Sequence, residues 1–243
     1  MNDEIIISGI QQIGIGVSNV EEAWKWYLEH FGMDIKIFEE AAVAGLKLPY
    51  TGGEPRKRHA VLAMNLQGGG GFEIWQYTER IPAAAKTTIQ LGDLGIYSAK
   101  IKCRDVKATY ETFKNKKLSI NDIETDPEGN EHFFVKDPYG NIFQVVEGKS
   151  WFKSERDKPT GAACGAIIGV SDIDKARKVY SDILGYDKVA YDKTSVFEDL
   201  KYLPGGQRKF RRILLQQSIP RIGFFSRLLG PAEIELVHLI DGI

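Results

Sequence analysis

The sequence is poor in the features that mark secreted, membrane-spanning or nucleic-acid-binding proteins. Its 243 residues include two cysteines, Cys103 and Cys164, which are too few for a disulfide framework or, unaided, a zinc site. The formal net charge is −1, so composition gives no support for binding to nucleic acid or to an anionic membrane. No apolar run approaches the roughly 20 residues of a membrane helix, and the acidic N-terminus is unlike a signal peptide. We therefore expect a soluble protein of the cytoplasm.

The sequence does contain an internal repeat. The stretch 11–33, QQIGIGVSNVEEAWKWYLEHFGM, predicts a short strand, a tight turn and an amphipathic helix, and it returns at 164–186 as CGAIIGVSDIDKARKVYSDILGY. In the first copy, Asn19 is a suitable helix N-cap and Gly32 suits the end of the helix. An internal repeat of this kind indicates that one structural unit occurs more than once in the chain.

Alternating polarity and turn signals extend each copy into a βαβββ unit, and another such unit lies between them. The middle unit opens with the strand IYSAKIKCRDV from Ile96 and closes on two strands around the turn DPYGN at 137–141. The last unit follows a polar, charged stretch that contains a proline. The other expected strands lie at 8–17, 34–39, 58–66 and 72–77 in the first unit, and at 131–135 and 142–146 in the middle unit.

These motifs resemble those of the vicinal oxygen chelate superfamily, which includes glyoxalase I, methylmalonyl-CoA epimerase, fosfomycin- and bleomycin-resistance proteins, and extradiol dioxygenases. The matching segments are QIGIGVSNV from Gln12, the WY pair at 26–27 and DPYGN at 137–141. The resemblance implies an α+β fold of three βαβββ modules, paired into a curved, mixed-sheet bowl as in glyoxalases. It places a complete two-module domain at 1–150, a linker at 151–160, and a third module, unpaired or part of an incomplete second domain, at 161–243.

An unpaired third module would expose a sheet edge and a concave face. We therefore expect that two chains pair through this module as a homodimer, or that a fourth module belongs to a longer protein. Either arrangement would cover the open face with another module of the same kind.

The resemblance also implies where a metal would bind, because the metal-dependent members take ligands from the first and last strands of each module. In the first two modules these positions are Gln12, Glu73, Ser98 and Gln144. A divalent ion prefers His, Asp or Glu, and only Glu73 is of that kind. A Zn, Ni, Mn or Fe ion is possible, but this donor set favours its absence. The third module offers no better set at these positions, which are Gly165 and Glu235.

Glu73 shares one face of its strand with Trp75 and Tyr77. If this face lines the bowl, a carboxylate and an aromatic wall would meet a flat or acyl ligand there. The alternative is an exposed polar strand face with two partly packed aromatic rings.

Two lysines occupy the first strand of the middle unit. Their neighbours Ala99, Ile101 and Cys103 form the apolar face under the helix, so Lys100 and Lys102 must point to the concave side. Two cations there would attract a carboxylate or phosphate. The alternatives are a solvated edge of the bowl and a salt bridge with Glu73.

Two other features have no assigned chemistry. His59 and His132 lie in strands, where a single histidine is more often structural or exposed than catalytic. The stretch Ile219 to Leu229 is apolar for an insertion, and it predicts a lid, an interaction patch or a local packing element.

Three kinds of function remain open. The first is a lyase or isomerase of the glyoxalase I type that acts on a small carbonyl or acyl-thioester compound, with Glu73 as metal ligand or base. A dioxygenase fits less well, because the extradiol enzymes of this superfamily hold iron with two histidines and a carboxylate. The second is a metal-free protein, similar to bleomycin-resistance proteins, that binds a small and anionic molecule. The third is a degenerate set of modules with a structural role.

Overall fold

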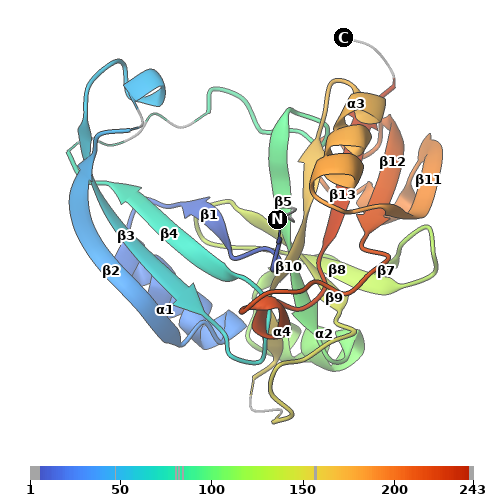
Figure 1. Ribbon diagram of the computed structural model, residues 1–243, viewed down its shortest axis with the longest axis horizontal. Helices are drawn as coiled ribbons and strands as arrows, with labels where there is room; N and C mark the ends of the chain where they lie inside the picture. The colour runs from blue at the N-terminus through green and yellow to red at the C-terminus, as the bar shows by residue number, and fades with distance from the viewer. Residues whose placement is uncertain are drawn as a thin grey trace, which may run out of the picture.

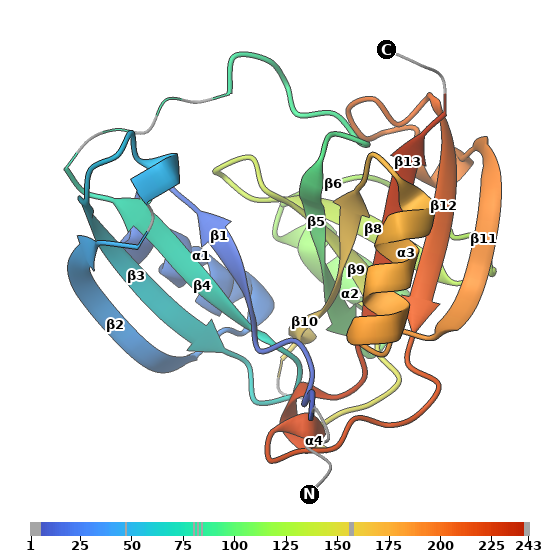
Figure 2. The same cartoon turned by 45° about the horizontal axis from the view of Figure 1, so that its top comes forward.

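The computed structural model describes residues 6–46, 48–79, 81, 83, 85–155 and 158–240. Its strands form two mixed β-sheets, one of four strands and one of nine, that lie beside each other (Figure 1, Figure 2). This architecture confirms the predicted α+β class and the curved mixed sheet. None of the described helices is long and apolar enough to cross a membrane.

The four-stranded sheet comes from the first unit of the chain. Its elements are β1 (Gln12–Gly16), α1 (Val20–Phe31), β2 (Ile35–Ala44), the 3-10 turn η1 (Leu48–Tyr50), β3 (Arg56–Met64) and β4 (Gly71–Tyr77). The Asn19 side chain caps α1 by accepting the backbone N–H groups of Glu21 and Glu22. Gly32 ends the helix at a φ of 64°, which glycine adopts without strain. The strand order is β1-β4-β3-β2, with β1 parallel to β4.

The nine-stranded sheet combines the rest of the chain. The middle unit contributes β5 (Gly95–Cys103), α2 (Val106–Asn115), β6 (Ser119–Ile120), β7 (Glu124–Thr125), β8 (Glu131–Lys136) and β9 (Ile142–Glu147). The last unit contributes β10 (Thr160–Gly169), α3 (Ile173–Lys178), the π-helical turn η2 (Val179–Ile183), β11 (Lys188–Val196), the 3-10 turn η3 (Glu198–Leu200), β12 (Lys209–Gln216), α4 (Ser226–Leu229) and β13 (Glu233–Leu239). The order is β11-β12-β13-β10-β5-β9-β8-β6, with β7 beside β8.

The first strands of the middle and last units, β5 and β10, join these two units. They pair antiparallel from Thr160 opposite Cys103 to Gly169 opposite Gly95. The expectation that residues 161–243 form an unpaired module is therefore wrong, and the predicted linker at 151–160 does not separate two independent sheets. Because β10 is paired within the chain, its edge is not open to a second chain, and a homodimer through another part of this module stays a prediction.

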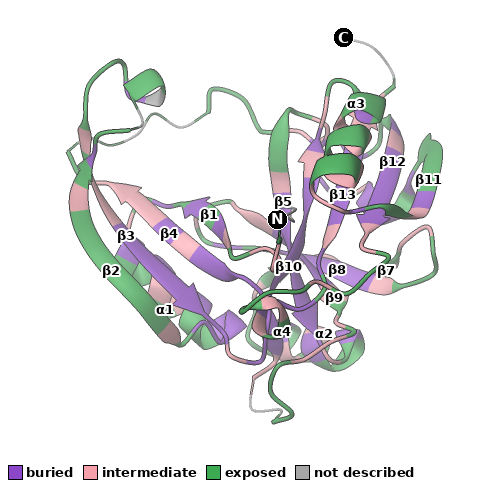
Figure 3. Cartoon of the chain, viewed as in Figure 1, coloured by how far each residue is buried: buried purple, intermediate pink, exposed green. Residues whose placement is uncertain are grey.

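Small residues explain why β10 can occupy the middle of the sheet. The strand reads TGAACGAIIG, and nearly all of its residues are buried, whereas the edge strands β2 and β11 are largely exposed (Figure 3). A Cβ on Gly165 would come within 2.2 Å of the Glu233 backbone oxygen. Glycine is therefore required where β13 approaches β10 this closely.

The first and middle units meet through an aromatic core instead of through their sheets. Tyr27 and Phe31 of α1 pack in one buried cluster with Phe113 of α2 and Phe143 of β9. The ring centres of Phe31 and Phe143 are 5.1 Å apart. The Tyr27 hydroxyl also donates a hydrogen bond to Asp137, in the DPYGN turn. The middle unit thus shares a core with the unit before it and a sheet with the unit after it.

Candidate functional site

A cavity of about 410 Å³ lies on the face of the nine-stranded sheet opposite α2. Ala99 and Ile101 of β5 belong to the core beneath α2, so alternation points Lys100 and Lys102 to the other face. This confirms the predicted orientation of the two lysines. The inner lining includes Lys100, Lys102, Gln144, Cys164, Glu233 and Glu235, which come from four adjacent strands.

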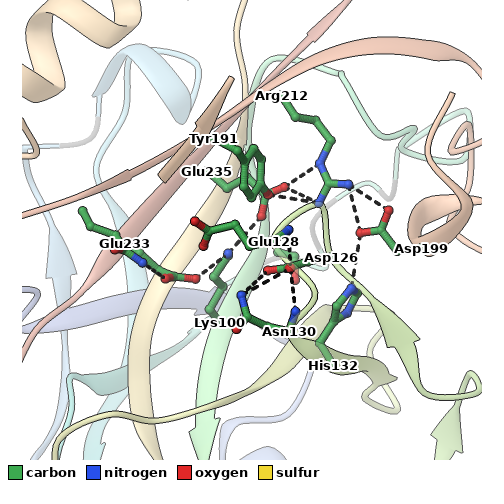
Figure 4. Close-up of polar contacts among 12 residues, drawn as sticks. Lys100, Asp126, Glu128, Asn130, His132, Tyr191, Asp199, Arg212, Glu233 and Glu235 are labelled. Atoms are coloured by element: carbon green, nitrogen blue, oxygen red, sulfur yellow. Dashed lines mark hydrogen bonds and ion pairs between the residues drawn. The ribbon is translucent and has the colours of Figure 1, made fainter. Parts of the chain in front are cut away.

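Lys100 forms a buried ion pair with carboxylates of the last unit. Its Nζ lies 2.7 Å from Glu233 Oε1 and 2.9 Å from Glu235 Oε2 (Figure 4). Burial alone would lower the pKa of Lys100, but the two carboxylates outweigh this effect and raise it. The predicted alternative, a salt bridge, is thus correct in kind, but the partners are Glu233 and Glu235 and not Glu73.

Beyond Glu235, the polar network continues through Arg212 of β12. The Arg212 Nε donates to Glu235 Oε1 at 2.7 Å, and its Nη1 lies 2.9 Å from both oxygens of Asp199. Asp199 is in turn 3.3 Å from His132 Nε2 of the middle unit. Burial alone would raise the pKa of Glu235, but Arg212 and Lys100 hold it well below its usual range. Both signs of charge are thus buried and paired in this network, on the side chains of Lys100, Asp199, Arg212 and Glu235 (Figure 4).

Lys102 lies in a different environment on the same strand. Its Nζ donates to the backbone oxygen of Ser150 at 2.8 Å and lies 5.0 Å from the centre of the Trp151 ring. No carboxylate among the described residues forms an ion pair with it. Burial lowers the pKa of Lys102 to about 8, with Cys164 opposing the shift and Arg104 adding to it.

Gln144 of β9 is opposite Lys100 in the sheet and is buried, with 2% of its surface exposed. Its Oε1 has no hydrogen-bond partner within the described part of the chain. A buried acceptor without a partner is destabilising unless a ligand or water satisfies it. Gln144 therefore offers a ligand one hydrogen-bond acceptor, close to the lysines.

Comparison of the sequence with family models identifies the superfamily. The family model of the Glyoxalase/Bleomycin resistance protein/Dioxygenase superfamily matches residues 9–145. The chain belongs to this superfamily. No curated protein shows significant sequence similarity to it.

Solved structures share the superfamily fold with this chain. Glyoxalase I from Zea mays superimposes with a TM-score of 0.56 at 15% identity, over 96% of this chain and 68% of that chain. A putative dioxygenase from Bacillus subtilis subsp. subtilis str. 168 gives a TM-score of 0.59 at 14% identity, over 99% of this chain and 66% of that chain. At these identities the likeness concerns the fold alone.

The superfamily's metal positions can now be tested against the cavity. The four ligands predicted for the first two modules are divided between the sheets. Gln12 and Glu73 lie in the four-stranded sheet, where Gln12 Nε2 donates to Glu73 Oε2 at 2.6 Å. Gln144 lines the cavity, whereas Ser98 borders a separate cavity of about 370 Å³ beside β1. The predicted set is therefore not brought together.

Within the nine-stranded sheet, the equivalent positions are Ser98, Gln144, Gly165 and Glu235. Only Glu235 is a usual metal donor, and its carboxylate is held by a lysine and an arginine. Across the described ranges, no three His, Cys, Asp or Glu side chains are arranged to hold an ion. The residues at the centre of this sheet do not fit a divalent metal, because protein cations already neutralise the one suitable carboxylate.

The predicted aromatic wall lies away from the cavity. Trp75 and Tyr77 belong to β4 of the four-stranded sheet, with their ring centres 6.2 Å apart. The guanidinium of Arg58 stacks over Trp75 at 4.7 Å. Glu73 shares their strand face, as expected, but none of the three lines the cavity. The structure therefore separates these residues from Lys100 and Lys102.

The apolar insertion packs against the first unit. It contains α4, whose Leu229 is buried, and the Leu228 carbonyl accepts the Gly69 N–H at 2.9 Å. Phe224 and Phe225 are exposed. Its local packing role is thus clear at Leu229, while a role as lid or interaction patch stays a prediction.

Proposed function

We propose that this protein binds a small anionic molecule in the cavity of the nine-stranded sheet, without a metal. The observation that carries the proposal is the Lys102 ammonium, which is buried and has a backbone carbonyl as its described hydrogen-bond partner. A buried cation without a counter-ion is unfavourable, so an anion that reaches it gains more than it would in water. Gln144 Oε1 adds an acceptor for a ligand hydroxyl or amide.

The distribution of charge around the cavity supports anion binding at its inner end. The rim carries both signs of charge, so the rim as a whole does not select for one charge. Its charged residues include Lys149, Lys188, Asp126, Glu128 and Glu147. Glu233 and Glu235 are already paired with Lys100. Lys102 is therefore the cation that an incoming carboxylate or phosphate would neutralise.

A lyase or isomerase of the glyoxalase I type is less well supported. It needs Glu73 as metal ligand or base, and Glu73 is hydrogen-bonded to Gln12 on the other sheet. No described histidine or carboxylate joins that pair as a metal site. Metal-free binding uses residues that do share one cavity.

The proposal is tested by thermal unfolding with a panel of small carboxylates and phosphates. At least one should raise the Tm of the protein, because a ligand that binds only the folded state stabilises it. The shift should vanish in Lys102→Met and persist in Lys107→Met, whose lysine side chain is 70% exposed on α2. A shift produced instead by divalent ions and abolished by Glu73→Ala would support the enzyme and overturn metal-free binding.

A further inference from the structure

The chain builds a specific slot for the Lys102 side chain. Gly148 and Gly161 lie on either side of it, at the ends of the two strands that flank β5. A Cβ on Gly148 would lie 2.8 Å from Lys102 Cβ, and one on Gly161 would lie 2.8 Å from both Lys102 Cγ and Trp151 Cζ3. Two glycines and a tryptophan thus hold the aliphatic stem, and the amine lies at the cavity.

The surroundings of this amine raise the fraction of it that is neutral at pH 7, although the ammonium remains the major form. Two titratable groups act on its pKa, namely Cys164 on β10, which raises it, and Arg104, which follows β5 and lowers it. Lys100 on β5 and Glu233 on β13 line the same cavity. Lys100 holds Glu233 in an ion pair, and Arg104 stacks at 4.1 Å on the same Trp151 ring. With its pKa near 8, Lys102 has a neutral fraction at pH 7 more than about a hundredfold that of an exposed lysine.

Cys164 also lines the cavity, but its thiol is not activated. Burial raises the pKa of the Cys164 thiol to about 12, so the thiol keeps its proton at neutral pH. The thiolate is the nucleophilic form of cysteine. Lys102 is therefore the reactive group of the pair.

We propose that Lys102 binds an aldehyde or 2-oxo acid covalently, as an imine. The lone pair of the neutral Nζ attacks the carbonyl carbon to give a carbinolamine, which then loses water. The two hydrogens of the amine leave with the carbonyl oxygen, and no oxidant or reductant is needed. Lysines with lowered pKa values form such adducts because the neutral amine is the nucleophile. The inference rests on the proposed binding cavity and names the class of its ligand.

The test compares glyoxylate with glycolate, which has a hydroxyl in place of the carbonyl. The full-length protein is incubated with each acid and sodium cyanoborohydride, and adducts are located by intact mass and peptide mapping. Glyoxylate should give one predominant adduct on Lys102, at a rate that rises with pH and levels off above about pH 8. Glycolate should give none.

Two variants control for folding and for general lysine reactivity. Lys102→Arg keeps the positive charge but cannot form the imine, so it should lose the adduct. Lys107→Met, on the exposed face of α2, should keep it. Labelling spread evenly over the exposed lysines, or an unchanged rate in Lys102→Arg, would overturn the imine.

Thermal shifts separate this inference from the binding function. If glycolate and glyoxylate both raise the Tm but Lys102 is not labelled, reversible binding stands and the imine is refuted. If Lys102 is labelled while glycolate gives no shift, the imine stands, and glycolate gives no support for reversible anion binding. If neither result appears, the imine with small 2-oxo acids is rejected, together with glycolate as a ligand.

Discussion

Lys100 and Lys102 lie on one face of β5, and both are buried, with 2% and 3% of their surface exposed. Their surroundings nevertheless shift their pKa values in opposite directions. Lys100 meets two carboxylates from β13, and its pKa is raised. Lys102 meets a backbone carbonyl and an indole, and its pKa falls to about 8. The comparison teaches that burial alone does not set the charge of a lysine; the carboxylates within reach decide it.

The largest loss of stability should follow from removing Arg212, which pairs with the same Glu235 as Lys100 does. Arg212→Met would leave Asp199 and Glu235 buried without their guanidinium, which should destabilise the protein by about 4–5 kcal/mol. Urea unfolding measures the change. Arg211→Met is the matched control, because its ion pairs are partly exposed and should contribute only about 0–1 kcal/mol. If the two variants lost the same free energy of unfolding, the buried ion pairs would contribute no more to stability than the partly exposed ones.

Lys100→Met tests the paired side of the comparison directly. Glu233 would lose the lysine and Glu235 would keep only its arginine, so the free energy of unfolding should fall by about 3–4 kcal/mol. The loss should shrink at low pH, where the freed carboxylates can take up protons. A variant as stable as the wild type would mean that the Lys100 pair contributes nothing to folding.

The same substitution two residues further along should have the opposite sign. Lys102→Met removes a buried charge that has no carboxylate partner among the described residues, and it should stabilise the protein at pH 7 by about 1–3 kcal/mol. In the wild type, the folded pKa of Lys102 is below its usual 10.5, so the unfolded state binds more protons between about pH 8 and 10.5. Stability should therefore rise with pH across this window, and Lys102→Met should lack that rise.

The smallest change in stability is expected at Gln144, the hydrogen-bond acceptor beside the two lysines. Gln144→Leu replaces a buried amide whose oxygen has no described partner, so stability should change by about 0–1 kcal/mol, in the stabilising direction. The same variant should reduce the Tm shift caused by an anionic ligand. A marked loss of stability would indicate that the amide is satisfied in the folded protein.

Local signals in the sequence were sufficient for the elements themselves. Asn19 and Gly32 fix the ends of α1 through backbone hydrogen bonds and a positive φ, both of which depend on neighbouring residues alone. Alternation along β5 likewise placed Lys100 and Lys102 on the correct face. Their roles toward a ligand stay predictions.

Pairing between units could not be predicted in the same way, because all three units carry similar local patterns. The strand GAACGA at 161–166 did hold a signal, since a run of small residues suits a strand that is buried on both faces. Arg212 was missed because its partners, Asp199 and Glu235, lie on different elements. The separation of Glu73 from the two lysines could not be predicted, because it depends on which strands join into one sheet.

The β5–β10 pairing has a consequence for any shortened form of this chain. A protein ending at residue 150 would contain the whole stretch that matches the superfamily, yet β5 would present a bare row of N–H and C=O groups where β10 now lies. Lys100 would also face solvent without its carboxylates. Exposed strand edges recruit other chains. Such a fragment should therefore self-associate. In the full chain, the last unit prevents this association because β10 covers the edge of β5.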